Sequence, residues 1–117
     1  MNTVKVVEAD DHTIGVCHEL ILTSLGDDVV PGAIGKAFPR EESLPGALQD
    51  IFGKPVDIVV FGYTHEAMVE THQRVLFVNP GNPGLVKQNM RLGTVAILEI
   101  TPESRAARII ELAALDA

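Results

Sequence analysis

The feature that most constrains the fold is an apolar segment of six residues that ends at a glycine. Positions 56–61 read Val-Asp-Ile-Val-Val-Phe, and Gly62 follows. A short run rich in β-branched residues predicts a strand, and near-continuous apolar character is typical of a strand covered on both faces. We therefore expect Val56 to Phe61 to lie in the centre of a sheet.

A β-hairpin is predicted at the start of the chain. Val4 to Val7 and Thr13 to Cys17 are apolar runs, and the residues between them, at positions 9–12, are typical of a turn. We expect His12 to lie in this turn with its side chain in solvent, because the tips of polar turns are exposed.

One amphipathic helix is predicted. The apolar residues of this segment are spaced as on one face of an amphipathic helix: Leu44, Leu48, Ile51 and Phe52. Ser43 is the expected N-cap, although Glu41 or Glu42 could begin the turn instead. Gly53 follows at the position where glycine commonly ends a helix. The preceding residues 20–39 contain repeated Gly and Pro, which indicates a loop region with room for one helical turn.

The second half of the chain is predicted to be rich in strands. Ala67 to Val69 and Val75 to Val78 form a candidate hairpin, with His72 as a solvated residue at its tip. Thr94 to Ile100 is strongly β-prone. The segment from Ala106 to Ala114 suits either a strand or a helix, since it mixes β-branched residues with alanines. A tandem turn signal, Asn-Pro-Gly-Asn-Pro-Gly, occupies positions 79–84.

Composition narrows the classes of protein. The 117 residues suit one domain, and a hydrophobic fraction of 46% excludes intrinsic disorder. A net charge of −7 argues against a protein that wraps nucleic acid, and no apolar run is long enough to cross a membrane. Cys17, the only cysteine, is expected to be a buried small hydrophobic residue. The lack of a secretion signal and of disulfides predicts a cytoplasmic protein.

Three strand ends carry side chains that could take part in chemistry. His18 follows the second arm of the first hairpin, and Tyr63 and His65 follow the central strand. Because side chains along a strand alternate with period two, we expect Tyr63 and His65 on the same side. Asn79 follows the strand ending at Val78. Polar groups at the carboxyl ends of strands are where sites of α/β proteins gather, although each residue alone is more often structural.

Taken in order, these features resemble the C-terminal part of the small bacterial and archaeal calcineurin-like metallophosphoesterases. The most specific block is the central strand with Gly62 and the Thr64–His65 pair, followed about 14 residues later by Asn-Pro-Gly. The resemblance implies an α/β fold, namely a partial α/β/β/α sandwich that is strand-rich with one firm helix. It also implies that residues 1–117 form a single truncated domain of this type.

The resemblance implies a site with two divalent metals (manganese, zinc, nickel or iron) that hydrolyses phosphate esters. His18 and His65 match histidines that bind metal in the family. The chain departs from the family pattern because its first three metal-binding motifs are absent, and because Glu19 and Tyr63 stand where glycine and a histidine are usual. A phenol is a poor ligand at neutral pH. Metal binding is therefore expected to be weak or absent, and no catalytic residue is assigned.

Tyr63 and Asn79 are the candidate substrate-binding residues. Tyr63 could donate a hydrogen bond to a phosphate, or it could simply fill the space of an absent metal. Asn79 could instead be a turn-former that supports the loop around His65.

Three functions remain open. The first is a degenerate phosphoesterase-fold protein that acts through self-association, as a homo-oligomer, or through a partner, because a partial sandwich exposes sheet edges and apolar surface. The second is a metal-dependent phosphodiesterase completed by another protein chain. The third is a weak single-metal or small-ligand module that uses His18, His65 and Glu19.

Overall fold

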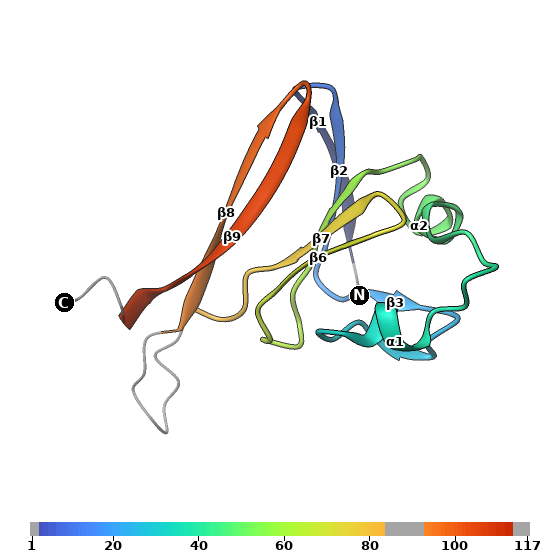
Figure 1. Ribbon diagram of the computed structural model, residues 1–117, viewed down its shortest axis with the longest axis horizontal. Coiled ribbons are helices and arrows are strands. Elements are labelled where there is room, and N and C mark those ends of the chain that lie inside the picture. Colours follow the sequence, from blue (N-terminus) through green and yellow to red (C-terminus); the bar gives the residue numbers. More distant parts are fainter. Residues whose placement is uncertain (1–2, 84–92, 114–117) are drawn as a thin grey trace.

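The computed structural model describes residues 3–83 and 93–113. Its elements, in chain order, are β1 (Val4–Ala9), β2 (His12–Cys17), β3 (Ile21–Leu22), β4 (Asp27–Asp28), α1 (Ala33–Ala37), α2 (Leu44–Phe52), β5 (Ile58–Val60), β6 (Met68–His72), β7 (Val75–Asn79), β8 (Thr94–Thr101) and β9 (Ser104–Glu111). Figure 1 shows a central sheet with the helices on one side and the long β8–β9 hairpin on the other.

The predicted central strand is confirmed in its position, although it is shorter than expected. The five-stranded sheet has the order β1-β2-β5-β7-β6, and β5 runs parallel to both β2 and β7. Ile58 and Val59 are completely buried. Parallel pairing on both edges and cover on both faces explain why this segment is almost continuously apolar.

Both hairpins of this sheet end in tight turns with a residue pair at positive φ. The pairs are Asp10–Asp11 between β1 and β2, and Gln73–Arg74 between β6 and β7. Two successive positive φ angles are the signature of the type I′ turn, whose twist matches that of the strands. Each turn holds only two residues, so the histidine beside it belongs to a strand.

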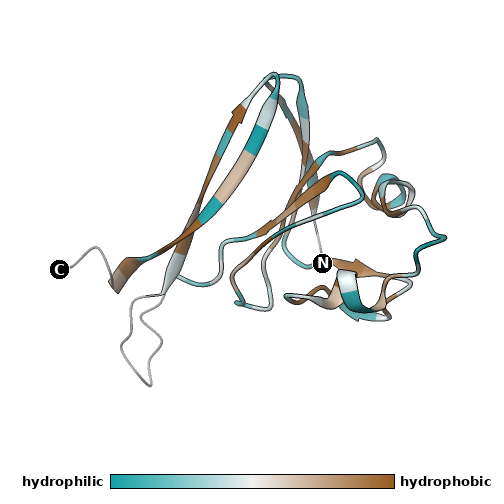
Figure 2. Cartoon of the chain, in the orientation of Figure 1, coloured by the Kyte–Doolittle hydropathy of each residue, from teal (hydrophilic) through white to brown (hydrophobic). Residues whose placement is uncertain are grey.

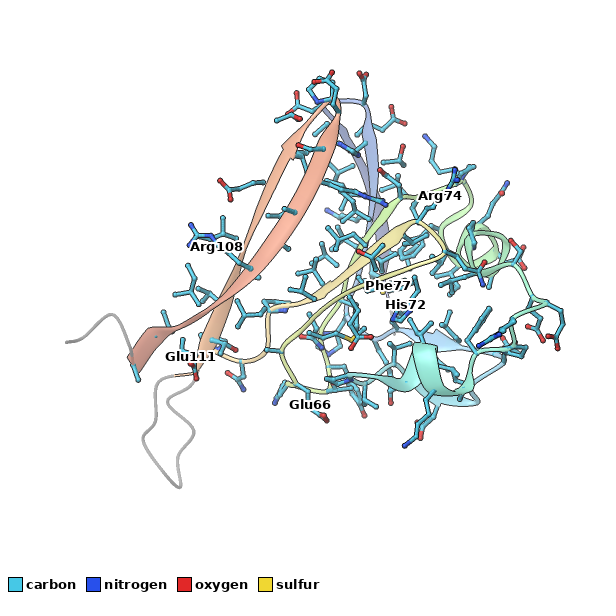
Figure 3. All side chains as sticks on the ribbon, in the orientation of Figure 1. Glu66, His72, Arg74, Phe77, Arg108 and Glu111 are labelled. Carbon is cyan, nitrogen blue, oxygen red and sulfur yellow. The ribbon has the colours of Figure 1, made fainter. Side chains whose placement is uncertain are left out.

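The predictions that His12 and His72 are solvated turn residues are therefore wrong. His12 is the first residue of β2 and is buried. His72 is the last residue of β6 and is half-buried, with its ring close to Phe77 (Figure 3). The sequence pattern located both hairpins but predicted turns that were too long, so each predicted turn included the neighbouring histidine.

The helical side of the sheet holds the larger core. Phe77 and Leu48 are fully buried there, and Cys17 is buried among them as predicted. Burial raises the pKa of the Cys17 thiol to about 11, which makes it unreactive at neutral pH. Figure 2 shows the hydrophobic residues concentrated along the central strands, with hydrophilic residues at the turns.

Helix α2 forms as the sequence predicts. The Ser43 hydroxyl accepts a hydrogen bond from the Gly46 N–H, and Pro45 lies in the first turn. Gly53 ends the helix with a φ of 82°. The loop expected before this helix contains a short helix, α1, and the small β3–β4 sheet, whose two-residue strands are too short to produce a periodic pattern.

The β8–β9 hairpin covers the other face of the sheet. Alternate residues of β8 pack on a second cluster, of which Ile14, Ile58, Leu76 and Val78 are the buried members. Thr94 to Ile100 is confirmed as a strand, and pairing with β8 makes Ser104–Glu111 a strand as well. That pairing resolves the ambiguity at 106–114. Gly84 and Ala114, which belong to two of the predicted segments, lie outside the described residues.

The fold class is thus confirmed as α/β, strand-rich with few helices. A helical layer, a five-stranded sheet and a two-stranded layer follow one another (Figure 1). In the part of the chain that the structure describes, no helix is long and apolar enough to cross a membrane.

Candidate functional site

The predicted site residues gather at one end of the sheet. His18 follows β2, the segment 62–65 follows β5, and Asn79 ends β7, so all three come from the carboxyl ends of neighbouring parallel strands. The Gly62 N–H donates a hydrogen bond to the His18 carbonyl oxygen over 2.9 Å. Ligands of open α/β sheets bind at this kind of edge.

Asn79 is the residue that organises this edge. It is 1% exposed, and its side-chain amide donates to the Gly62 carbonyl at 3.4 Å and to the Thr64 hydroxyl at 3.1 Å. Its Oδ1 accepts the Gly81 N–H at 2.9 Å. One buried amide therefore holds the loop after β5 against the loop after β7, which corresponds to the supporting role weighed for Asn79.

Tyr63 and His65 are exposed and do not follow strand alternation. Strand β5 ends at Val60, and Tyr63 and His65 have φ angles of 71° and 62°. The left-handed region is unfavourable for residues other than glycine, and strain of this kind concentrates at functional sites. The expectation that these two side chains share one side of a strand is therefore wrong, because the backbone leaves the sheet before it reaches them.

His18 lies against Tyr63. The two ring centroids are 5.7 Å apart and the planes meet at 86°, an edge-to-face arrangement. Such pairs are favourable by about 0.5–1.5 kcal/mol beyond the area they bury. Tyr63 is nevertheless 50% exposed, so the pair forms a surface feature.

His65 and Glu19 interact with other neighbours. The Asn82 side-chain amide donates to Nδ1 of His65 over 3.3 Å, which leaves the ring proton on Nε2 in the neutral imidazole. Glu19 shares a hydrogen bond with Asp28, and this bond, together with burial and the charges of nearby carboxylates, raises the pKa of Glu19. Glu19, the third ligand proposed for a single-metal site, thus interacts with the carboxyl group of Asp28.

The residues present fit a family-type metal centre poorly. A catalytic zinc site uses three protein ligands and keeps a position for water. Within residues 3–83 and 93–113, no group of three or more His, Cys, Asp or Glu side chains is placed to hold a metal ion. His18 and His65 are the histidines at this edge, and the third aromatic group there is the phenol of Tyr63.

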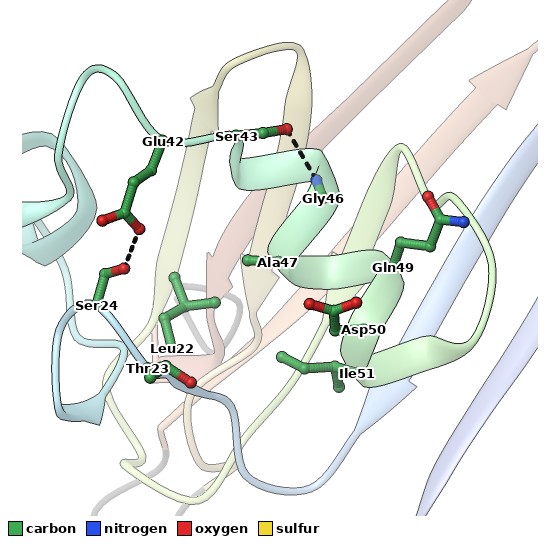
Figure 4. Close-up of a pocket in the computed structure, with 10 residues that line it drawn as sticks. All are labelled: Leu22, Thr23, Ser24, Glu42, Ser43, Gly46, Ala47, Gln49, Asp50 and Ile51. Carbon is green, nitrogen blue, oxygen red and sulfur yellow. Dashed lines mark hydrogen bonds between the residues drawn. The ribbon is translucent and has the colours of Figure 1, made fainter.

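A groove of about 800 Å³ lies elsewhere, between α2 and the residues after β3 (Figure 4). Its wall includes the Ser43 cap of α2 and the hydrogen bond between Ser24 and Glu42. No predicted site residue lines it. The candidate site is therefore the loop edge around His18, Tyr63 and His65.

Sequence reasoning missed a second polar cluster at the opposite end of the sheet. There the buried His12 contacts Asp57, Thr101 and Ser104. The polar Asp57 inside the apolar run at positions 56–61, directly before β5, was the available signal, because a carboxylate beside a buried strand needs a partner.

Comparison with known proteins agrees with this fold. A family model described as the calcineurin-like phosphoesterase superfamily domain matches residues 1–103. No curated protein matches the chain.

Three solved structures illustrate the similarity. An archaeal phosphodiesterase is 21% identical with a TM-score of 0.52, over 92% of this chain and 50% of that protein. A protein from Thermotoga maritima is 23% identical with a TM-score of 0.51, over 93% and 54%. A single mutant of Vps29 from Entamoeba histolytica is 18% identical with a TM-score of 0.53, over 93% and 60%. The chain thus spans 50% to 60% of the length of these structures.

Proposed function

Because the chain belongs to the calcineurin-like phosphoesterase superfamily, we propose that it acts through self-association or a partner chain and does not hydrolyse phosphate esters on its own. The observation that carries this proposal is the donor set at the loop edge. His18 lies against the Tyr63 ring, and Nδ1 of His65 accepts a hydrogen bond from Asn82. Two imidazoles in these arrangements supply fewer ligands than a catalytic metal needs.

The second support is apolar surface on the sheet. Val7 of β1 is paired with Ile14 and so faces the β8–β9 side, yet it is 48% exposed. Strand β1 is also an edge of the sheet. An open edge beside an exposed apolar side chain is a surface that associates readily.

Sedimentation velocity over a range of protein concentrations tests the association. We expect the chain to form a homo-oligomer, and we expect Val7→Arg to weaken it at least tenfold, because a buried unpaired charge costs more than about 1.4 kcal/mol. Ile21→Arg is the matched control, since Ile21 is 49% exposed on the separate β3–β4 sheet. Equal weakening by both substitutions, or a wild-type chain that stays monomeric, would contradict self-association through this face.

A second candidate is a metal-dependent phosphodiesterase that another chain completes. It is favoured by the intact support of the loop edge, where Asn79 and Gly62 hold the segment carrying His65 beside His18. In that case His18 and His65 would bind a divalent metal and Tyr63 would contact the phosphate ester. Calorimetry with Mn²⁺ and Zn²⁺ on the chain with and without a complementing chain distinguishes the candidates. Binding that needs the second chain and is lost in His18→Ala favours this alternative.

A further inference from the structure

A buried histidine joins the β8–β9 hairpin to the sheet. The His12 side chain is 10% exposed, and its Nδ1 lies 2.6 Å from Oδ2 of Asp57. Its Nε2 lies 2.7 Å from the carbonyl oxygen of Thr101 and 3.0 Å from that of Ser104. Thr101 ends β8 and Ser104 begins β9, so the ring holds the tip of the hairpin (Figure 1).

The partners of His12 determine its protonation state. A backbone carbonyl can only accept a hydrogen bond, so Nε2 must carry a proton. Asp57 also acts as an acceptor, because its Oδ1 takes the Thr13 N–H at 2.8 Å and its Oδ2 lies 3.4 Å from the Arg105 guanidinium. Nδ1 must then carry a proton as well. Both contacts are satisfied only by the imidazolium form.

The surrounding charges favour that form on balance. Asp57, from the segment before β5, and Asp10 and Asp11, from the adjacent turn, are negative. The hairpin contributes Glu103 in its tip and the opposing positive charge of Arg105, which also donates to the carbonyl oxygens of Asp57 and Arg74. The remaining charged pair of this region, Glu8 and Lys54, neutralises itself at 2.6 Å. The hydrogen bond to Asp57 is the main reason that the pKa of His12 is raised, and the Thr101 carbonyl adds to it.

We propose that His12 is a pH-dependent clamp whose imidazolium fastens the tip of the β8–β9 hairpin to β2 and β5, and that loss of one proton loosens the hairpin. The hairpin covers the buried cluster that includes Ile58 and Val78, so loosening it exposes an apolar face of the sheet. This inference stands apart from the proposed function, since it involves neither His18 nor His65.

The direction of the pH dependence follows from the raised pKa. A group that is more basic in the closed form stabilises that form fully below its ordinary pKa, here about 6.5, and the stabilisation is lost as the pH rises through the closed-state pKa. Between those two values the opening constant rises up to tenfold per pH unit, because one proton is released.

Hydrogen exchange tests the clamp. We expect the protection factors of the β8 and β9 amides, corrected for intrinsic exchange, to fall as the pH rises above about 6.5. In His12→Gln the neutral amide still donates to the Thr101 carbonyl but cannot titrate, so the protection should not vary with pH. In Asp57→Asn the amide donates to a neutral His12, which should also remove the pH dependence. His72→Gln is the matched control and should behave as the wild type, because His72 contacts Glu70 and not the hairpin tip.

The ring nitrogens provide an independent measurement on the unaltered chain. Nitrogen chemical shifts of His12 should show both nitrogens protonated at pH 6.5, when an ordinary histidine is half neutral. A neutral His12 ring at that pH, pH-independent protection in the wild type, or an unchanged pH dependence in His12→Gln would each overturn the proposal.

Discussion

At the scale of single residues, buried polar side chains organise both ends of the sheet. Asn79 holds the loops at the carboxyl ends of the parallel strands, and Asp57 with His12 holds the hairpin tip at the other end. The sequence could indicate Asn79 because it follows a strand and precedes Pro-Gly. It could not indicate His12, since its partners at Thr101 and Ser104 are about 90 residues away in the chain.

Replacing Asn79 with alanine should destabilise the fold by about 1–3 kcal/mol, because buried groups that it satisfies lose their partners. The Gly62 carbonyl and the Gly81 N–H are the backbone groups concerned. Urea unfolding measures the change. Thr64→Val is the control, since it removes a single contact of Asn79 and should cost less. Equal costs would show that the amide does not bridge the two loops.

At the scale of elements, close packing determines how α2 lies on the sheet. A Cβ atom at Gly15 of β2 would come within 2.9 Å of three ring carbons of Phe52, at the end of α2. Glycine in the middle of a strand commonly marks such a close approach. The helix itself was predictable, because its cap, its apolar stripe and its final glycine all lie within its own sequence. The contact between Gly15 and Phe52 was not, because sequence periodicity carries no information about which elements touch.

Gly15→Ala should therefore cost about 1–3 kcal/mol through overpacking. Phe52→Leu should restore part of this loss in the double variant, because the smaller side chain leaves room for the new methyl group. A double-mutant cycle by thermal or urea unfolding measures the coupling between the two positions. Strictly additive effects would mean that the ring of Phe52 moves away without cost.

At the scale of the whole molecule, local patterns predict most of the strands, whereas the strand order β1-β2-β5-β7-β6 depends on tertiary pairing. The central strand, both hairpins and the β8 strand could be predicted, because each has local periodicity or turn chemistry. The ambiguous segment at 106–114 could not, since only pairing with β8 makes Ser104–Glu111 a strand. The site residues lie at one edge as expected, but the left-handed backbone at Tyr63 and His65 prevents any placement by alternation.

We propose that the residues of this chain do not form a hydrolytic centre by themselves. Hydrolysis of bis-p-nitrophenyl phosphate by the purified 117-residue chain with Mn²⁺ tests it most directly. His65→Ala is the matched variant, because His65 is exposed and its loss leaves the support by Asn79 in place. We predict the same background rate for both proteins. A metal-dependent rate in the wild type that disappears in His65→Ala would contradict the account.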